Sequence, residues 1–208
     1  MSQFFVVHPQ NPQTRLISQA VAIVRNGGLL VYPTDSGYAL GCKLENKSAL
    51  DRICSIRKLD AKHNFTLMCR DLSELSTYAS INNIAYRLIR NNTPGPYTFI
   101  LKGTKEVPRR LMNQKRKSIG IRIPNNKIAL ALLEDLGEPL MSTSLILPDS
   151  DFTESDPIDI REKLEHQVDV IIDGGVLGDT PTTVINFEKD NNIEIMREGS
   201  GDISAFVN

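Results

Sequence analysis

Hydrophobic and polar positions along the chain switch repeatedly between a helical period and a strand period. Apolar stripes with the helical spacing predict helices over 12–26, 46–54, 72–78, 84–90, 127–136 and 158–166. Apolar runs and alternating stretches predict strands over 29–33, 65–69, 97–102, 119–123, 140–147, 168–172, 182–187 and 193–197. This alternation predicts one α/β domain over residues 1–208, built on a twisted mixed sheet with flanking helices.

Local signals place several ends of these elements. Asn11 and Pro12 resemble the N-cap and first residue of the first helix, and Gly27-Gly28 ends it. Asn46 is suited to capping the second helix. In the strand 119–123, three isoleucines alternate with Gly120 and Arg122, so one face is apolar and the other carries Arg122.

Composition narrows the class of protein. The chain has 208 residues, of which 40% are hydrophobic and 24% charged, and this is typical of a globular protein. Its three cysteines form no CxxC pair, which indicates a reduced setting. The apolar runs are too short to cross a bilayer, and the first residues lack a signal-peptide pattern. We therefore expect a cytosolic protein with no membrane partner.

The near-neutral net charge conceals a strong asymmetry. Residues 1–130 carry 20 Lys and Arg against 7 Asp and Glu, a balance of +13, and residues 131–208 carry 4 against 18, a balance of −14. The densest basic stretch, residues 102–117, is called the basic segment here. Its positive residues are Lys102, Lys105, Arg109, Arg110, Lys115, Arg116 and Lys117. Such a stretch can neutralise nucleic-acid phosphates, or the two oppositely charged parts can simply complement each other.

Several standard sites are missing from the sequence. It has no phosphate-binding GxxxxGK[ST] loop, no GxGxxG and no GxSxG. The three histidines have neither the spacing nor the cysteine neighbours of a zinc site, so we predict no metal site. We expect His63, which follows Lys62, to be a solvated loop residue rather than a catalytic base.

Polar residues stand at the ends of two predicted strands. Thr34 follows a buried strand, and Ser142, Thr143 and Ser144 lie within another. Crevices outside strand ends are where open α/β sheets bind ligands, and hydroxyls with Arg122 suit phosphate or carboxylate oxygens. The alternative is a set of turn-forming hydroxyls with a surface arginine.

Five motifs in order carry a resemblance to a known family. Residues 31–42 read VYPTDSGYALGC, and they are followed by PGPYT at 94–98, IRIP at 121–124, PLMSTS at 139–144, and DGG at 173–175 with TVI at 183–185. This series, closed by Arg197-Glu198-Gly199, resembles the YrdC-like family, which includes threonylcarbamoyl-AMP synthases. The stretch 57–62 most resembles the YciO branch. The resemblance implies a deep basic cleft on a twisted sheet, with affinity for RNA and nucleotides.

The resemblance also implies roles for individual residues. Thr34 matches the threonine-pocket hydroxyl, Arg122 the arginine that holds the threonine carboxylate, and Arg197 an arginine beside the phosphates. The full set of nucleotide- or substrate-binding candidates is Thr34, Arg57, Lys58, Lys62, Thr98, Arg122, Thr143, Ser144 and Arg197, and the RNA-binding candidates are the seven positive residues of the basic segment.

Two departures from the family pattern bear on activity. The K-x-R motif reads Arg57-Lys58-Leu59, and the S-x-N motif reads Ser144-Leu145-Ile146. Both changes remove polar groups that could bind a ligand. We therefore predict a protein that binds double-stranded or structured RNA, or its nucleotide parts, and that needs no cofactor to do so. The alternative is a threonylcarbamoyl-AMP synthase or related nucleotidyltransferase of tRNA modification, which would need ATP and Mg²⁺.

Overall fold

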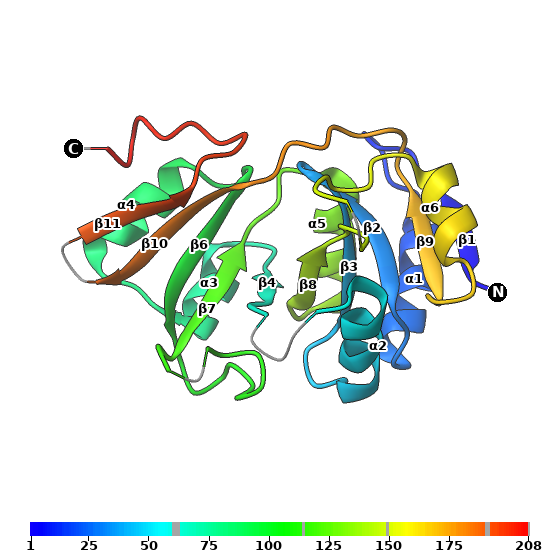
Figure 1. Ribbon diagram of the computed structural model, residues 1–208, viewed down its shortest axis with the longest axis horizontal. Helices are drawn as coiled ribbons and strands as arrows, with labels where there is room; N and C mark the ends of the chain where they lie inside the picture. Colours follow the sequence, from blue (N-terminus) through cyan, green and yellow to red (C-terminus); the bar gives the residue numbers. More distant parts are fainter. Residues whose placement is uncertain (60–62, 114, 149, 190–191, 208) are drawn as a thin grey trace.

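Ten strands follow one another in a single mixed sheet, and an eleventh pairs with one of them. A computed structural model describes residues 1–59, 63–113, 115–148, 150–189 and 192–207 (Figure 1). The strand order is β1-β9-β2-β3-β8-β4-β7-β6-β10-β11, and β5 pairs with β6. Strands β8 and β4 pair at the middle of this order, with β1, β9, β2 and β3 on one side of this pair and β7, β6, β10 and β11 on the other (Figure 1).

The strands in chain order are β1 Gln3–Val6, β2 Leu30–Thr34, β3 Gly37–Lys43, β4 Thr66–Met68, β5 Ala79–Ser80, β6 Tyr97–Gly103, β7 Ser118–Arg122, β8 Leu140–Ser144, β9 Val170–Asp173, β10 Thr183–Lys189 and β11 Asn192–Arg197. The helices are α1 Thr14–Arg25, α2 Lys47–Arg57, α3 Leu72–Tyr78, α4 Asn83–Asn91, α5 Lys127–Leu136 and α6 Pro157–Leu164. The predicted α/β fold with a mixed sheet and flanking helices is confirmed.

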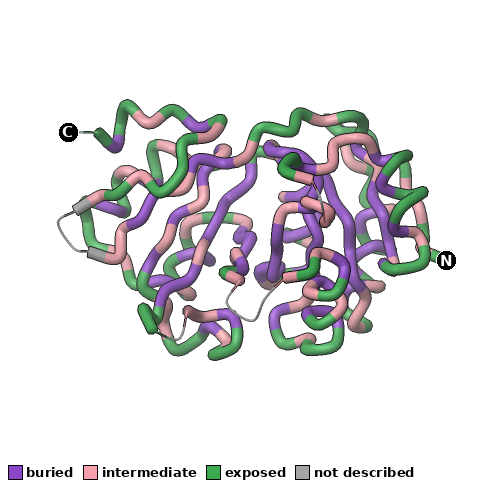
Figure 2. The backbone as a smooth tube through the Cα atoms, viewed as in Figure 1, coloured by how far each residue is buried: buried purple, intermediate pink, exposed green. Residues whose placement is uncertain are grey.

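Two apolar cores lie against the sheet. In one, α1 and α5 pack on β2, β3, β8 and β9, with Val21, Leu30 and Leu133 among the buried side chains. In the other, α2, α3, α4 and α6 contribute residues such as Ile53, Ile89 and Ile160 to the opposite side of the sheet. Figure 2 shows the result, with central strands mostly buried and outer helix faces exposed.

Capping explains why some predicted boundaries are correct. The Asn126 side chain accepts hydrogen bonds from the backbone N–H groups of Ile128 and Ala129, both at 3.0 Å, so α5 begins at Lys127. Gly137 ends this helix with a φ of 76°, a conformation that favours glycine. Asn46 caps α2 as predicted, since its Oδ1 accepts from the Ala49 N–H at 3.0 Å.

Other predictions of the fold were wrong. The first helix begins at Thr14 rather than Pro12, because the Gln13 carbonyl is the acceptor for the first helical N–H groups. The strand predicted over 140–147 ends at Ser144, where the chain turns and the Ile146 N–H donates to the Ser144 carbonyl at 3.0 Å. The sequence analysis also missed β1, β3 and β5.

Within the described ranges, no helix is both long enough and apolar enough to cross a membrane. The sequence-based assignment of 1–208 to one domain stays a prediction.

The two bonds of the Asn46 side chain lead to a test of the fold. Besides capping α2, its Nδ2 donates to the Gly27 carbonyl at 2.7 Å, which ties the end of α1 to the start of α2. We expect Asn46→Ala to lower the free energy of unfolding by about 2 kcal/mol in urea denaturation, and Asn46→Asp, which keeps the cap acceptor, to cost about half as much. Equal losses in the two variants would contradict a role for the Gly27 bond.

Candidate functional site

A cavity of about 330 Å³ lies over one face of the C-terminal half of the sheet. Side chains alternate along these strands, so every second residue faces the cavity and the residues between them enter the core. The cavity-facing set is Thr66, Thr98, Ile100, Gly120, Arg122 and Val184, whereas the core set is Leu67, Phe99, Ile121 and Ile185. Strand pairing brings the first set together, because Gly120 lies beside both Ile100 and Thr66.

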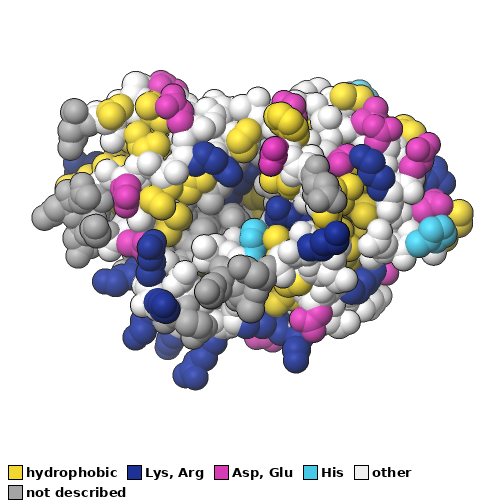
Figure 3. All heavy atoms as spheres, viewed as in Figure 1, with side chains coloured by type: hydrophobic (Ala, Val, Ile, Leu, Met, Phe, Trp, Pro, Cys, Tyr) yellow, Lys and Arg dark blue, Asp and Glu magenta, His cyan; other side chains and the backbone are white. Residues whose placement is uncertain are grey.

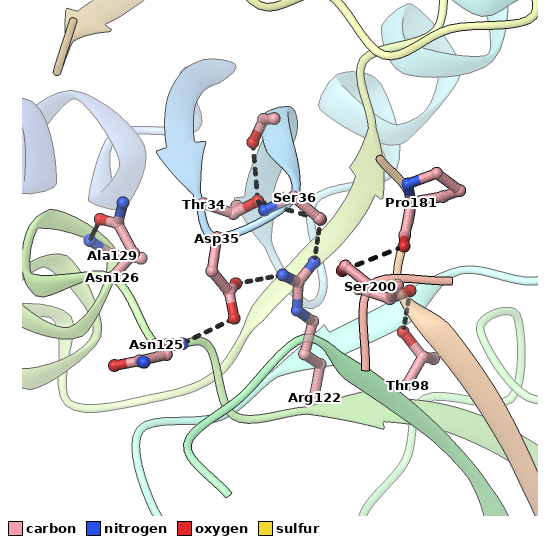
Figure 4. A network of polar contacts seen from close by, with 12 residues as sticks. Thr34, Asp35, Ser36, Thr98, Arg122, Asn125, Asn126, Ala129, Pro181 and Ser200 are labelled. Atoms are coloured by element: carbon pink, nitrogen blue, oxygen red, sulfur yellow. Dashed lines mark hydrogen bonds and ion pairs between the residues drawn. The ribbon is translucent and has the colours of Figure 1, made fainter. Parts of the chain in front are cut away.

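Arg122 points from β7 to the turn between β2 and β3, as Figure 4 shows. Its guanidinium donates to the Ser36 hydroxyl at 2.9 Å and forms an ion pair with the carboxylate of Asp35. The other oxygen of Asp35 accepts from the Asn125 N–H at 3.1 Å. Arg122 is 5% exposed, and its Nε is buried without a hydrogen-bond partner. The arginine is therefore a buried, internally paired group rather than a surface residue.

Thr34 shapes the turn that supplies these partners. Its hydroxyl donates to the Gly37 carbonyl at 2.6 Å and accepts from the Ser36 N–H at 3.1 Å. Gly37 has a φ of 93°, and a Cβ there would lie 2.6 Å from the Thr153 side chain, so only glycine fits this position. The turn thus holds Asp35 and Ser36 toward the cavity.

A second arginine lies on the wall formed by the end of β8. The Nε of Arg57 donates to the Ile146 carbonyl at 3.0 Å, and its Nη1 donates to the Thr143 hydroxyl. The Nε2 of His63 is 3.2 Å from the same hydroxyl. Burial lowers the pKa of Arg57, but an arginine still keeps its charge at neutral pH. Half-buried His63 is thus part of the site, and the expectation of a solvated loop histidine was wrong.

A third arginine joins β10 to β11 at the far end of the cavity. Arg197 donates from Nε to the Thr182 carbonyl at 2.9 Å and from Nη2 to the Thr182 hydroxyl at 3.0 Å. That hydroxyl is also 3.0 Å from the hydroxyl of Thr98 on β6. Burial and the charge of Arg122 both lower the pKa of Arg197, so an anion placed between the two arginines would be stabilised.

Most of the predicted nucleotide-binding residues converge on this cavity. Those that line it are Thr34, Arg57, Thr98, Arg122, Thr143, Ser144 and Arg197. Lys58 does not line it, because this residue ends α2 in a left-handed conformation and its side chain is exposed. The role of Lys58 in ligand binding therefore stays a prediction, and Lys62 lies outside the described residues.

The basic segment forms one side of the cavity as well as an exposed surface. All seven of its positive residues are exposed, and Lys and Arg side chains gather at the lower left edge of the face in Figure 3. Arg116, which the sequence analysis lists only among the RNA-binding candidates, also lines the cavity, together with Leu111 and Asn113 from the same segment. Arg116 also pairs with Glu188 at 3.4 Å, and Arg110 donates to the Leu44 carbonyl at 3.0 Å.

Ion pairs link the basic and acidic parts of the sequence at several places. They join Arg25 to Asp135, Lys43 to Glu138, Arg52 to Asp169 and Arg116 to Glu188. Part of the charge asymmetry is therefore used inside the folded chain, where basic residues of the first part pair with acidic residues of the second. Among the described residues, the four lysines of the basic segment form no ion pair, so their charges are available to another partner.

The two residues that depart from the family pattern occupy different places. Leu59 packs against the apolar core and does not line the cavity. Ile146 does line it, and its carbonyl holds Arg57 against β8. The change at residue 59 therefore leaves the site without a side chain from that position, and the change at residue 146 adds apolar surface to the lining.

The lining does not fit a resident Mg²⁺ ion. Mg²⁺ sites in proteins use one or two carboxylates together with substrate phosphates, and the described lining holds no Asp or Glu. Asp35, the nearest carboxylate in the network, already binds Arg122 and the Asn125 N–H. Nor do the described residues contain a group of three or more His, Cys, Asp or Glu side chains arranged to hold a metal.

Comparison with known proteins identifies the family. A model of the Sua5/YciO/YrdC family, described as telomere recombination, matches residues 22–199. The chain belongs to the Sua5/YciO/YrdC family. It is 67% identical to the uncharacterized protein YciO of Escherichia coli K12 over 207 residues, which is all of both chains. The crystal structure of E. coli YciO matches over the full length of both chains with a TM-score of 0.95.

More distant members of the family share the fold. The chain is 25% identical to the threonylcarbamoyl-AMP synthase of Vibrio vulnificus over 164 residues, covering 77% of this chain and 87% of that protein. The crystal structure of Pyrococcus abyssi Sua5 complexed with L-threonine matches 95% of this chain and 58% of that chain, with 24% identity and a TM-score of 0.87. The same sheet therefore underlies proteins with widely different sequences.

The buried pair of Arg122 and Asp35 predicts a specific pattern of stabilities. Arg122→Met leaves the Asp35 carboxylate without its partner, and we expect it to lower the free energy of unfolding by about 3 kcal/mol. Adding Asp35→Asn removes the unpaired charge, so the double variant should recover a large part of that loss in urea denaturation. A double variant no more stable than Arg122→Met would contradict this account of the pair.

Proposed function

We propose that this protein binds nucleotides in the cavity and RNA along the basic segment. The observation that carries the proposal is the charge of the lining, which in the described part of the chain contains four arginines and His63 but no acidic residue. Arginine guanidinium groups bind phosphate oxygens through paired hydrogen bonds, and the threonine and serine hydroxyls beside them add single bonds. A ligand that carries phosphate matches this set of donors.

The ion pairs suggest which arginines meet the ligand's charge. Asp35 offsets Arg122, and Glu188 offsets Arg116. Within the described residues, no ion pair joins Arg57 or Arg197 to a carboxylate, so these two charges are balanced when an anion enters.

The rest of the cavity suits the organic part of a nucleotide. Phe65, Ile100, Leu111 and Ile146 add apolar surface to the polar lining. The volume of about 330 Å³ lies at the small end of the range of ligand pockets, roughly 300–1,000 Å³. A mononucleotide combines an apolar base with a charged phosphate, and both kinds of surface are present here.

The exposed basic segment supports RNA as the larger partner. Its lysines lie outside the cavity, and neutralising successive phosphates releases counterions from the nucleic acid. A-form RNA presents phosphates and 2′-hydroxyls to such a surface, so recognition would depend on shape more than on sequence. The cytosolic location stays a prediction from the sequence.

A second candidate function is the reaction named for the V. vulnificus relative, threonylcarbamoyl-AMP synthesis. Thr34, Thr98 and Arg197 support it, because they match the family's substrate contacts and share this one cavity. Leu59 and Ile146 weigh against it, since two polar contacts are missing. Binding is therefore the better-supported function.

Salt dependence tests the role of the basic segment. We expect Lys102→Gln, Lys105→Gln, Lys115→Gln and Lys117→Gln together to make the plot of log affinity for an RNA duplex against log salt shallower by about 2–3. Fluorescence anisotropy with a labelled duplex measures this slope, and the affinity for AMP should hardly change because these lysines do not line the cavity.

The matched control removes the same number of exposed positive charges elsewhere. It carries Arg15→Gln, Lys47→Gln, Arg87→Gln and Arg90→Gln on helices α1, α2 and α4. If this control changes the slope as much as the lysine variant does, general electrostatic attraction explains binding and the basic segment has no special role.

The synthase reaction provides a second test. Each missing charge-assisted hydrogen bond costs about 1.5–3 kcal/mol, so we expect this protein to release pyrophosphate from ATP, with threonine and bicarbonate, roughly a hundredfold or more slowly than the V. vulnificus relative. Ile146→Asn restores one of the missing polar groups at a position that lines the cavity, so it should raise the rate. Leu59→Arg should instead destabilise the fold, because Leu59 packs on the core. Release at the relative's rate by the unaltered protein would make the synthase the leading function.

A further inference from the structure

The basic segment and the cavity share a wall. Leu111, Asn113 and Arg116 line the cavity, whereas Lys102, Lys105, Lys115 and Lys117 of the same segment are exposed and do not line it. The side chain of Asn113 donates to that of Asn64 at 3.2 Å, which joins this wall to the other side of the cavity. An RNA lying on the lysines is therefore close to this wall of the cavity.

The size of the cavity limits which part of an RNA can enter. A double helix is too wide for a cavity of about 330 Å³, which is comparable with the pocket of a small ligand. An unpaired nucleotide has no such restriction, and enzymes that act on a base take it out of the stack in the same way. When an RNA lies on the basic segment, only an unpaired nucleotide of that RNA can thus enter the cavity.

The cavity has one end near the basic segment and a far end, and Arg197 lies at the far end. Ser118 on β7 pairs with Lys102 of the basic segment, so this end of β6 and β7 adjoins the wall. Thr98, Thr182 and Arg197 lie at the opposite end of the strands, where β6 pairs with β10. Because Arg197 lies at the end of the cavity away from the basic segment, a terminal phosphate that follows its nucleotide into the cavity can reach this guanidinium.

We propose, building on the nucleotide and RNA binding proposed above, that the cavity receives the phosphorylated unpaired end of an RNA whose duplex lies on the basic segment. The terminal phosphate binds Arg197, the base packs against apolar side chains such as Leu111, and Arg116, on the wall shared with the basic segment, contacts the RNA chain. The preferred RNA thus combines a duplex with a short single-stranded end.

The experiment compares forms of one labelled RNA duplex by anisotropy at fixed salt. The forms are a blunt duplex and duplexes with a short overhang that ends in a hydroxyl, a 5′-phosphate or a 3′-phosphate. We expect one phosphate-ended form to bind tenfold or more tightly than both the hydroxyl-ended form and the blunt duplex. AMP in excess should remove this advantage and leave the binding of the blunt duplex unchanged.

Variants separate the two parts of the interaction. Arg197→Gln should abolish the advantage of the terminal phosphate but keep the affinity for the blunt duplex, and the four lysine substitutions should weaken every form. Equal affinity for all forms, or a phosphate advantage that survives Arg197→Gln and excess AMP, overturns the proposal while RNA and nucleotide binding stand. Failure of every RNA form to bind overturns the proposal and RNA binding together, and AMP binding then shows whether the cavity still takes nucleotides.

Discussion

The ion pair between Arg122 and Asp35 connects two parts of the sheet that are not neighbours. Arg122 belongs to β7 and Asp35 follows β2, and strands β3, β8 and β4 lie between these two in the sheet. Both side chains are nearly buried, so removing one charge leaves the other buried without a partner, which destabilises the fold. The pair also fixes the turn of Thr34 and Ser36, and through it the position of the Thr34 hydroxyl in the cavity. The cavity lining thus includes one arginine, Arg122, whose charge the fold already offsets.

This arrangement changes the meaning of the conserved-looking motif residues. Arg122 resembles a ligand-binding arginine in sequence, yet its terminal nitrogens already hold Asp35 and Ser36. Arg57 is likewise held against β8 by Thr143 and Ile146. The guanidinium groups are thus oriented by the protein before any ligand arrives, which reduces the cost of ordering them on binding. Pre-arranged donors of this kind are suited to a binding site.

The sequence predicts those features that depend on neighbours along the chain. The alternation of Ile119, Ile121 and Ile123 with Arg122 correctly places Arg122 on a polar face, and the bounds of α5 follow from Asn126 and Gly137. Strand β3 was missed because it is buried on both faces and contains two glycines, which hides any alternation.

Features that depend on distant residues could not be found in the same way. His63 and Thr143 meet only because the loop after α2 reaches β8, and Leu59 enters the core for the same reason. Nothing in the basic segment's own composition distinguishes Arg116, which faces the cavity, from its exposed neighbours. Which groups share a site is therefore a property of the strand order rather than of any one stretch of sequence.

The position of β10 and β11 in that order also determines when the cavity can form. Thr183 pairs with Tyr97, and Arg197 closes the far end from the last strand of the chain. Because synthesis proceeds from the N-terminus, the segments that carry Thr34, Arg57 and Arg122 are complete long before their last partner leaves the ribosome. Pairing between strands so far apart in sequence is also slow, because closing the loop between them costs entropy before any stabilising contact forms. Until β10 and β11 are added, the growing chain therefore contains an incomplete, positively charged sheet. During this interval the chain is open to misfolding and to binding by anions.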